Sequence, residues 1–566
     1  MNSSLAHLCV DINSGVKEVS QAMSSRTPSG ETYGIAFVTN DFGRICGVVS
    51  DSDLRKYIAQ HGELPSNIQK LIQRDFVSIE LDSELSHSEF VNSLRSQIGK
   101  TFKTSISPIR YIPVTSEGKL HSIIDLRALK LDGLDTLDEV FVIGLGYVGI
   151  TLACYLSSKG KKVSGIDTST SQINRLKSGK IAIHEPGLAE VLESGLSEGT
   201  LTFRTNLKEL ETGKGTCYFF ICVPTPVDDA GIANLSFVET AAIEVGRYLK
   251  KGDVVFLRST VPVGTTRAIA EMLAKHASLT PGIDFTCCYA PERTIEGKAF
   301  EELGGLPQIV GGLTPNCQKL GSAFFESLGN NVVPVSSTES AEIVKIASNS
   351  YRDYVFGFSN SLAIMATSWN LDVNEIINAS NFGYPRNQIP QPSPGVGGPC
   401  LSKDPYLMQN QSLKVLGNIY HSRKINEQMP EILARRAVKA WQSLGKEPKN
   451  KVLLVGMAFK GTPPTNDLRN SPSSSVQEYL MASGMIVDTW DAVISDSIIP
   501  NSDYGMYIIM NNHESNSALV LESLKSNKQE FVCIVDPWLL LNKSVLFSLS
   551  PGGRFIYLTL SQEISI

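Results

Sequence analysis

The sequence lacks the features that would place the protein in a membrane, on a nucleic acid or outside the cell. No uncharged apolar run reaches the length of about 18 residues that a membrane helix needs, and no basic segment precedes an apolar one at the N-terminus, so neither a membrane span nor a signal peptide is expected. The net charge of −6 leaves no broad basic surface for a nucleic acid. The ten cysteines are scattered, without the spacing of a zinc site or a disulfide framework, which predicts a metal-free protein in the reducing cytoplasm.

The length of 566 residues predicts three or four domains, and the first part of the chain contains an internal repeat. Residues 36–55 and 111–129 each read as a short strand, a polar turn with glycine, a second strand and the start of a helix. An amphipathic helical stretch precedes each copy, near residues 15–24 and 84–97. The first 131 residues are therefore predicted to form a paired α+β module.

This repeat resembles a pair of cystathionine-β-synthase (CBS) domains, a family in which a Gly-x-x-Ser/Thr-x-x-Asp segment binds the ribose of an adenine nucleotide. The first copy matches in full from Gly47 to Asp53, which makes Ser50 and Asp53 the candidate nucleotide contacts. The second copy has Asp125 and Ala128 at the corresponding positions, which predicts a degenerate site. A role in packing or dimerisation without any ligand stays open.

Strand-like apolar runs alternate with helical patterns from residue 140 onward, which is typical of βαβ units and a parallel sheet. The runs of the first half lie at 140–143, 163–167, 218–223 and 253–258. Residues 338–380 read as one continuous helix, and a second α/β run starts at 451–457 and continues at 486–491, 504–510 and 531–537. The predicted fold is α/β, with two Rossmann-like doubly wound domains joined by a long central helix and preceded by the α+β pair.

The loop after the first of these strands has the pattern of a dinucleotide site. Gly144, Gly146 and Gly149 form a G-x-G-x-x-G that allows a tight turn, a close approach of the pyrophosphate and close packing of helix on strand. The free N–H groups at the helix start then bind the phosphates. Asp167 ends the second strand, where an acid pairs with a ribose 2′-hydroxyl and repels a 2′-phosphate. NAD is therefore the predicted cofactor, rather than NADP.

A single cysteine occupies a glycine-rich turn much further along the chain. Residues 395–405 read GVGGPCLSKDP, with Cys400 followed by Lys403 and Asp404. A nearby cation favours the thiolate, which is the nucleophilic form of cysteine. A buried and inert cysteine fits the same segment, so these residues alone leave both interpretations open.

Seven motifs, in this order, resemble the UDP-glucose/GDP-mannose dehydrogenase family of nucleotide-sugar 6-dehydrogenases over most of the chain from residue 140 onward. They are GLGYVG at 144–149, VPTP at 223–226, STVPVGTT at 259–266, PERTIEG at 291–297, AEIVKIASN at 341–349, GGPCLSKDP at 397–405 and GMAFKGTPPTNDLRNSP at 456–472. Seven motifs in the family's order are far more specific than any one of them.

The resemblance implies NAD-dependent oxidation of a sugar CH2OH to a carboxylate, in two steps through an aldehyde. It makes Cys400 the nucleophile that holds the aldehyde as a thiohemiacetal and then as a thioester, because an unbound aldehyde would escape between the two oxidations. It assigns the developing oxyanion to Lys345 and Asn349, which share one helix face.

The resemblance implies further roles in hydrolysis and binding. Glu292 becomes the general base for thioester hydrolysis, and Thr260 and Asp404 hold or polarise its water. The implied cofactor contacts are Gly144, Gly146, Tyr147, Val148, Gly149, Asp167, Thr225, Thr260 and Glu296. The implied contacts to a UDP-sugar are Glu292, Lys345, Asn349, Arg386, Lys403, Lys460 and Arg469. Asn470 departs from the Glu that is common in the family at this position, so a local ion pair of the family is not expected here.

The segment YPRNQIPQPSPGVGGPC at 384–400 is similar to the N-acetylhexosamine branch of the family, whose members oxidise UDP-N-acetylmannosamine (UDP-ManNAc) or UDP-N-acetylglucosamine (UDP-GlcNAc). Arg386 is then the candidate sugar contact, from the same subunit or from a partner. The implied product is a uronic acid for surface polysaccharide. UDP-glucose stays open as an alternative substrate.

The predicted domains are a CBS pair at 1–131, an NAD-binding domain at 138–337, a central helical region for dimerisation and catalysis at 338–440, and a UDP-sugar-binding domain at 441–566. A homodimer or a higher homo-oligomer is expected through the long helix. Two other functions stay open. A β-hydroxyacid dehydrogenase would stop after two electrons and needs no cysteine in the turn, and a nucleotide-sensing regulator would have lost catalysis. The intact set of Lys345, Asn349, Cys400 and Asp404 argues against the regulator.

Overall fold

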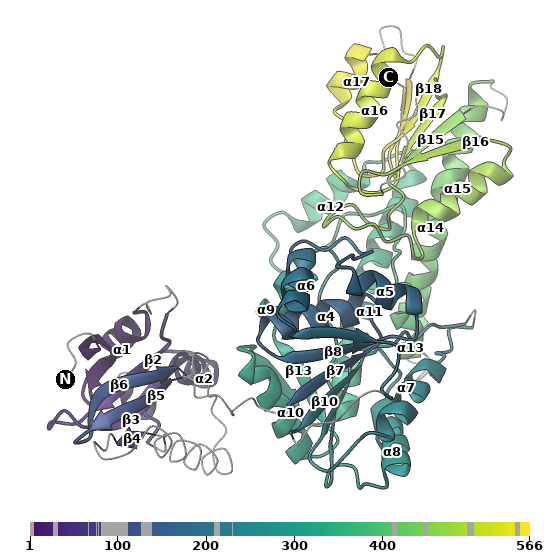
Figure 1. Ribbon diagram of the computed structural model, residues 1–566. Helices are drawn as coiled ribbons and strands as arrows, with labels where there is room; N and C mark the ends of the chain where they lie inside the picture. Colours follow the sequence, from purple (N-terminus) through teal and green to yellow (C-terminus); the bar gives the residue numbers. More distant parts are fainter. Residues whose placement is uncertain are drawn as a thin grey trace. The chain divides into compact units, whose positions relative to one another are not determined.

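The computed structural model describes residues 5–25, 32–65, 67–74, 76, 78–80, 111–125, 138–208, 215–228, 230–409, 417–445, 451–494, 503–549 and 555–565. The chain divides into two compact units, residues 1–137 and residues 138–566. In Figure 1 the first unit runs from purple to blue and the second from blue to yellow.

Two three-stranded sheets of the same topology contain the strands that the structure describes in the first unit. β1 (Cys9–Asp11) pairs in parallel with β2 (Ile35–Thr39), which forms an antiparallel hairpin with β3 (Ile45–Ser50). β4 (Ile79–Glu80), β5 (Tyr111–Ser116) and β6 (Lys119–Asp125) repeat this arrangement. Both hairpins shift register at the same place, after Val38 in one and after Val114 in the other. The predicted internal repeat is therefore present in the strands.

The helices of the first unit agree with the predicted pattern where the structure describes them. α1 (Val16–Met23) buries Val19 and Met23 in the core of the unit, and α2 (Asp51–His61) follows the first hairpin. Short 3-10 turns span Ala6–Leu8 and Ile68–Lys70. The helix predicted near 84–97 and the helix start after the second hairpin, which includes Ala128, lie outside the described residues.

An eight-stranded sheet, in the order β14-β13-β12-β11-β10-β7-β8-β9, forms the first half of the second unit (Figure 1). Its strands are β7 (Glu139–Ile143), β8 (Lys162–Ile166), β9 (Leu201–Arg204), β10 (Cys217–Ile221), β11 (Val254–Leu257), β12 (Thr286–Tyr289), β13 (Gln308–Gly312) and β14 (Val332–Val335). Neighbouring strands run parallel except β12 and β13. Alternate side chains of β7 enter two different cores, Val140 and Val142 on one face and Phe141 and Ile143 on the other, as expected for a strand that helices cover on both sides.

Helices pack on both faces of this sheet. α4, α6 and α10 contribute to one core, and α7 and α8 contribute to the other. The helices are α4 (Tyr147–Ser158), α5 (Thr170–Lys177), α6 (Leu188–Ser197), α7 (Ser236–Gly246), α8 (Thr265–Ala277), α9 (Ala299–Gly305) and α10 (Pro315–Ser327). The strand order reverses direction between β7 and β10, and in such sheets ligands bind at that point, beyond the carboxyl ends of the strands.

The central helix is shorter than predicted. α11 (Thr338–Thr367) is one helix of 30 residues, and a turn separates it from α12 (Val373–Asn381). Asn370 adopts a left-handed φ of 50°, and the Asp372 side chain caps α12 by accepting from the N–H of Asn374. The prediction of a single helix over 338–380 is therefore wrong, because the apolar spacing continues through a turn that Asn370 and Asp372 specify.

A second sheet follows α13 (Asp404–Gln409) and α14 (Gly417–Ser443), in the order β16-β15-β17-β18-β19-β20. Its strands are β15 (Lys451–Val455), β16 (Ile486–Trp490), β17 (Met506–Ile509), β18 (Val532–Val535), β19 (Phe555–Leu558) and β20 (Glu563–Ser565), parallel except for β19 and β20. α14 and α15 (Pro472–Ala482) contribute to the core on one face, and α16 (Ser515–Ser526) and α17 (Lys543–Leu549) lie over the other. The predicted α/β fold with two parallel sheets is confirmed.

Candidate active site

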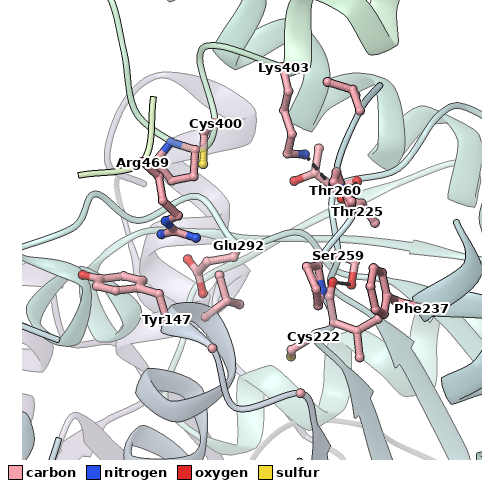
Figure 2. Close-up of a pocket in the computed structure, with 18 of the residues that line it drawn as sticks. Tyr147, Cys222, Thr225, Phe237, Ser259, Thr260, Glu292, Cys400, Lys403 and Arg469 are labelled. Carbon is pink, nitrogen blue, oxygen red and sulfur yellow. Dashed lines mark hydrogen bonds between the residues drawn. The ribbon is translucent and has the colours of Figure 1, made fainter. Parts of the chain in front are cut away.

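One cavity of about 1960 Å³ lies at the carboxyl ends of the first sheet and is closed by segments from later in the chain. Figure 2 shows Cys400, Lys403 and Arg469 reaching toward the loops that carry Glu292, Thr225 and Thr260. The cavity brings together most of the predicted site residues: Gly144, Gly146, Tyr147, Val148, Asp167, Thr225, Thr260, Glu292, Glu296, Lys345, Cys400, Lys403 and Arg469. Five predicted residues of the second unit do not line it: Gly149, Asn349, Arg386, Asp404 and Lys460.

The glycine loop has the geometry that a dinucleotide requires. Gly144 has a φ of 90°, which is a left-handed conformation that favours glycine. A Cβ on Gly146 would meet no atom within 4 Å, so the backbone at the start of α4 is open to a ligand. A Cβ on Gly149 would lie 1.8 Å from the carbonyl oxygen of Gly144, so only glycine fits where α4 packs on the loop. These residues fit the pyrophosphate of NAD.

Asp167 follows β8 at the edge of the same loop. Its Oδ2 accepts from the N–H of Leu145 at 2.8 Å, and its Oδ1 accepts from the N–H of Ser169 at 2.9 Å. These two bonds hold the carboxylate on the rim of the cavity. An acid in this place fits a ribose with free hydroxyls.

Tyr147 contacts a carboxylate that the sequence did not point to. The Tyr147 hydroxyl donates to Glu185, and Glu185 also accepts from the N–H of Gly297 at 2.8 Å. Burial and the neighbouring Glu185 raise the pKa of the Tyr147 hydroxyl far above its usual range. The loop around Glu296 is thereby tied to the start of α4. Glu185 lies outside every motif, so no sequence signal identified it.

Cys400 is exposed to the cavity, in the turn that precedes α13. Burial within the surrounding protein raises the pKa of its thiol, while the positive charge of Lys345 opposes that rise. The net pKa lies above the ordinary value, so the thiol is protonated near neutral pH. The expectation that nearby cations favour the thiolate is right for their contribution, but burial outweighs it.

Lys345 and Asn349 lie one turn apart on α11 and are both buried. The Lys345 charge acts to lower the pKa of both Cys400 and Glu292, and Lys345 lines the same cavity as both residues. The Asn349 amide donates to Oδ2 of Asp404 at 2.6 Å. The Lys403 ammonium lies 3.1 Å from Oδ1 of Asp404. Asn349 and Asp404 thus stand behind the cavity wall as a pair.

Glu292 is buried against an arginine that the motifs did not include. Arg258, which is 2% exposed, approaches Oε2 of Glu292 at 2.5 Å. Oε1 accepts from the N–H groups of Arg293 and Thr294 at 2.7 and 2.8 Å. Burial acts to raise the pKa of Glu292, but the charge of Arg258 and these hydrogen bonds outweigh it, so the pKa is lowered. Glu292 is therefore a carboxylate throughout the neutral range.

A group of charged side chains joins the two halves of the second unit around Glu296. The Lys460 ammonium donates to the Glu296 carbonyl at 2.6 Å, and the Arg469 guanidinium lies 3.3 Å from the Glu296 carboxylate. Arg469 also pairs with Asp467 at 2.5 Å. Burial and the charge of Asp467 raise the pKa of Glu296 to about 7. Burial lowers the pKa of Lys460 to about 8.

Two predicted sites remain, one at Arg386 and one in the first unit. Arg386 packs over the ring of Tyr384, with its guanidinium 4.3 Å from the ring centroid, and does not line the cavity. In the first unit, the Ser50 hydroxyl donates to Oδ2 of Asp53 at 2.6 Å, and Oδ1 of Asp53 accepts from Gln73 at 3.2 Å. Ser50 and Asp53 form a capping box at the start of α2, so their spacing also has a purely structural explanation.

Family comparisons match three segments of the chain. Residues 138–329 match the NAD binding domain of the UDP-glucose/GDP-mannose dehydrogenase family, and residues 339–428 match the central domain of that family. Residues 3–60 match the CBS domain. These segments carry the glycine loop, the Lys345 and Cys400 motifs and the first copy of the repeat.

Individual proteins are similar over more than half of the chain. The UDP-N-acetyl-D-mannosamine dehydrogenase of Pyrococcus horikoshii is 34% identical over 359 residues, which is 63% of this chain and 84% of the relative. The enzyme of that name from Yersinia pestis is 32% identical over 61% of this chain and 83% of the relative. A solved UDP-D-ManNAc dehydrogenase from P. horikoshii matches with a TM-score of 0.67 at 30% identity, over 75% of this chain and 99% of its own. A UDP-glucose dehydrogenase from Pyrobaculum islandicum matches with a TM-score of 0.63 at 26% identity, over 75% of this chain and 98% of its own.

The part of the chain that the structure describes holds neither a membrane span nor a cluster of metal ligands. None of its helices combines the length and the apolar character needed to span a bilayer. No three histidine, cysteine or acidic side chains there converge as ligands of a metal ion.

Proposed function

Because the chain belongs to the UDP-glucose/GDP-mannose dehydrogenase family, we propose that it oxidises C6 of a UDP-N-acetylhexosamine to the carboxylate with two NAD. The observation that carries this proposal is that Cys400 is exposed to the same cavity as the dinucleotide loop and Lys345. A thiol has no use in a single hydride transfer, but it can hold an aldehyde between two of them. The cysteine therefore favours the four-electron reaction over a β-hydroxyacid dehydrogenation.

Each oxidation removes a hydride from C6 and a proton from its hydroxyl, and the proton passes to water. Bound NAD would supply the acceptor for both hydrides, the first from the C6 alcohol and, after exchange of the dinucleotide, the second from the sulfur-bound intermediate. The Cys400 sulfur adds to the aldehyde carbon, its proton goes to the aldehyde oxygen or to water, and a thiohemiacetal forms. Loss of the second hydride and of the hydroxyl proton gives a thioester. Water then cleaves the C–S bond, which releases the carboxylate and returns the thiol.

Lys345 is placed to act on the sulfur and on the oxyanion. Its charge lowers the pKa of Cys400, which offsets part of the burial, and the same charge stabilises a negative oxygen on the adjacent carbon. Asn349 lies one turn further along the helix, and its amide is bonded to Asp404 behind the cavity wall. The lowered pKa of Glu292 makes its carboxylate a weak proton acceptor. Glu292 is therefore better suited to orient the hydrolytic water than to take a proton from that water and keep it. Thr260 lines the same wall and supplies a hydroxyl for that water.

The substrate we favour is UDP-ManNAc, on the similarity to dehydrogenases of that name at 34% and 32% identity. UDP-GlcNAc and UDP-glucose are the competing substrates. The test is a panel of the three UDP-sugars with NAD, read as NADH absorbance. UDP-ManNAc is expected to give two NADH per sugar, and turnover of UDP-glucose alone would overturn the choice of substrate. The uronic acid formed would serve surface polysaccharide.

The covalent role is tested by Cys400→Ser, with Cys46→Ser in the first unit as the matched control. We expect Cys400→Ser to lose the yield of two NADH per sugar, because a serine hydroxyl is a far weaker nucleophile than a thiol. Cys46→Ser keeps full stoichiometry. Complete uronate production by Cys400→Ser would remove the covalent intermediate from the mechanism.

We propose that two copies associate through α11. Tyr351, Phe358 and Met365 recur every seven residues along the helix and are exposed by 66%, 47% and 50%. Three large apolar side chains in one stripe are typical of a surface that a partner covers. Phe358→Glu is expected to give monomers in light scattering, whereas Phe547→Glu, at an exposed position of α17, leaves the dimer intact. A monomeric wild type would refute the arrangement. Arg386 would then act on the sugar bound by the partner.

Two further proposals concern cellular context and control. All ten cysteines are free thiols, which supports a reducing compartment, the cytoplasm.

We also propose that the first unit binds an adenine nucleotide near Ser50 and Asp53 and so changes activity or assembly. The Asp53 carboxylate would then bond the nucleotide ribose in addition to capping the start of α2. Calorimetry with ATP, ADP and AMP, and kinetics after deletion of residues 1–130, test this. No binding, or unchanged kinetics and oligomer size, would remove the regulatory role and leave packing as the role of the unit.

A further inference from the structure

A buried guanidinium bonds the backbone of the Cys400 turn, and its residue lines the same cavity as the thiol. Arg423 of α14 is 1% exposed. Its Nη2 donates to the carbonyl of Val396 at 2.8 Å, and its Nη1 donates to the carbonyl of Leu401 at 3.1 Å. These two carbonyls stand four residues before and one residue after Cys400. One side chain thus holds both ends of the segment that carries the nucleophile.

The guanidinium is itself fixed by α11. Oδ1 of Asp353 accepts from Nη1 of Arg423 at 2.7 Å, and Asp353 is fully buried. The Asn426 amide donates to the same Oδ1 at 2.9 Å and to the Asp353 carbonyl at 2.9 Å. Asp353 lies two turns beyond Lys345 on the same helix. Arg423 therefore connects the Cys400 turn to the helix that carries the proposed oxyanion group.

The chemistry of the contact requires arginine. A guanidinium presents several N–H groups in one plane, so it can bond two carbonyls and a carboxylate at once. A lysine has one ammonium on a flexible stem and cannot span both carbonyls in this geometry. Since an unpaired charge is costly to bury, the Asp353 partner explains how the guanidinium can lie inside the protein.

The turn is also held from its other side. The Asn470 amide donates to the Ser402 hydroxyl at 2.9 Å, and a Cβ on Gly397 would lie 2.2 Å from the Asn470 carbonyl oxygen. Asn470 has a left-handed φ of 50°, which asparagine tolerates better than the glutamate common at this position. The backbone on both sides of Cys400 is thus fixed, while the cysteine itself faces the cavity.

We propose that Arg423 is a positioning residue for Cys400: by bonding the carbonyls of Val396 and Leu401 it fixes the sulfur at the distance from C6 that thiohemiacetal formation needs. Arg423 itself forms no bond with the reacting atoms. The proposal rests on the nucleophilic role proposed for Cys400. A displacement of about 1 Å at a reacting group can slow the chemical step by about a hundredfold while ligand binding is retained.

The chain offers a matched control on the same helix. Arg436 of α14 is half-buried and also bonds loop carbonyls, those of Thr559 and Leu560 at 3.0 and 2.5 Å. Its loop lies at the end of β19, away from the residues that line the cavity. Arg436→Lys therefore disrupts the same kind of contact, in which one arginine bonds two main-chain carbonyls, without changing the contacts of the Cys400 turn.

The experiment compares Arg423→Lys with Arg436→Lys in the full-length enzyme. Arg423→Lys is expected to lower kcat by about ten- to a hundredfold, to leave KM for the UDP-sugar and for NAD within about threefold, and to release aldehyde with fewer than two NADH per sugar. The rate at which iodoacetamide alkylates Cys400 in Arg423→Lys is expected to differ from the wild-type rate. Arg436→Lys keeps kcat, stoichiometry and alkylation rate. Melting temperatures of both variants show how far each is destabilised.

The outcomes separate this inference from the function on which it rests. Retention of kcat by Arg423→Lys, or equal losses in both lysine variants, overturns the positioning role. If Arg423→Lys does not fold, Asp353→Asn replaces it, and a kcat and stoichiometry equal to wild type then overturn the role. Full uronate production by Cys400→Ser would instead remove the proposed nucleophile, whatever Arg423 does.

Discussion

The carboxyl group of Glu296 makes the stability of the second unit depend on pH in a direction opposite to most carboxylates. Its side chain is 13% exposed and lies against Asp467 and Arg469. Burial and the charge of Asp467 raise the pKa of Glu296 from 4.5 to about 7. In Glu296→Gln the amide mimics the protonated acid, because it can donate to Asp467 and accept from Arg469 without ionising.

The sign and the size follow from proton linkage. Between pH 4.5 and 7 the folded chain keeps a proton that the unfolded chain has lost, so the free energy of unfolding falls as the pH rises through this window. A difference of about 2.5 pKa units corresponds to at most about 3 kcal/mol. Below the window both states are protonated, and above it both are ionised, so the contribution is constant on either side.

The assay is urea unfolding from pH 4.5 to 8.5, followed by tryptophan fluorescence. All four tryptophans lie in the second unit, at positions 369, 441, 490 and 538, so the signal reports this unit alone. Glu296→Gln is expected to remove the loss of about 3 kcal/mol and to be more stable than wild type at pH 8.5. Glu522→Gln, at an exposed ion pair with Lys525, is the control and keeps the wild-type slope. Parallel pH curves for wild type and Glu296→Gln would refute the burial argument.

Three other outcomes are expected. Gly149→Ala places a Cβ 1.8 Å from the Gly144 carbonyl, so NAD affinity measured by fluorescence titration falls by more than about tenfold, and unchanged affinity would contradict the packing. The raised pKa of Cys400 predicts an iodoacetamide alkylation rate that still increases above pH 9, and Lys345→Met slows alkylation at any fixed pH below that because it removes the charge that lowers the pKa. Ser50→Ala breaks the capping box of α2 and is expected to lower the free energy of unfolding of the first unit by about 1 kcal/mol, measured by circular dichroism on the full chain.

The sequence predicted the parts of the site that depend on local chemistry. Gly144 and Gly149 are where they are because no other residue fits, and such a requirement is visible as a glycine pattern. Asp167 ends its strand at the expected edge of the same loop. The βαβ alternation predicted both parallel sheets, because buried strands need apolar residues on both faces.

What could not be predicted depends on contacts between distant residues. Arg423 bonds main-chain carbonyls. Every residue has such a carbonyl, so the sequence does not indicate which ones an arginine will bond. Arg258 and Glu185 lie far along the chain from the carboxylate and the hydroxyl that they contact. The end of α11 was missed because apolar spacing ignores the turn at Asn370. These are tertiary relations, which the order of residues does not state.

The length of α11 has a consequence for how the two reaction centres of a dimer would communicate. Its 30 residues form a rod of about 45 Å, at about 1.5 Å per residue. Lys345 lies near the N-terminal end of α11, and Phe358 and Met365 lie in its C-terminal half. A stiff helix therefore links the proposed oxyanion group to the proposed contact between copies. In the proposed dimer, a tilt at the contact would be transmitted along the rod to Lys345. This helix alone could then couple the two active sites of the dimer and make their turnover rates unequal.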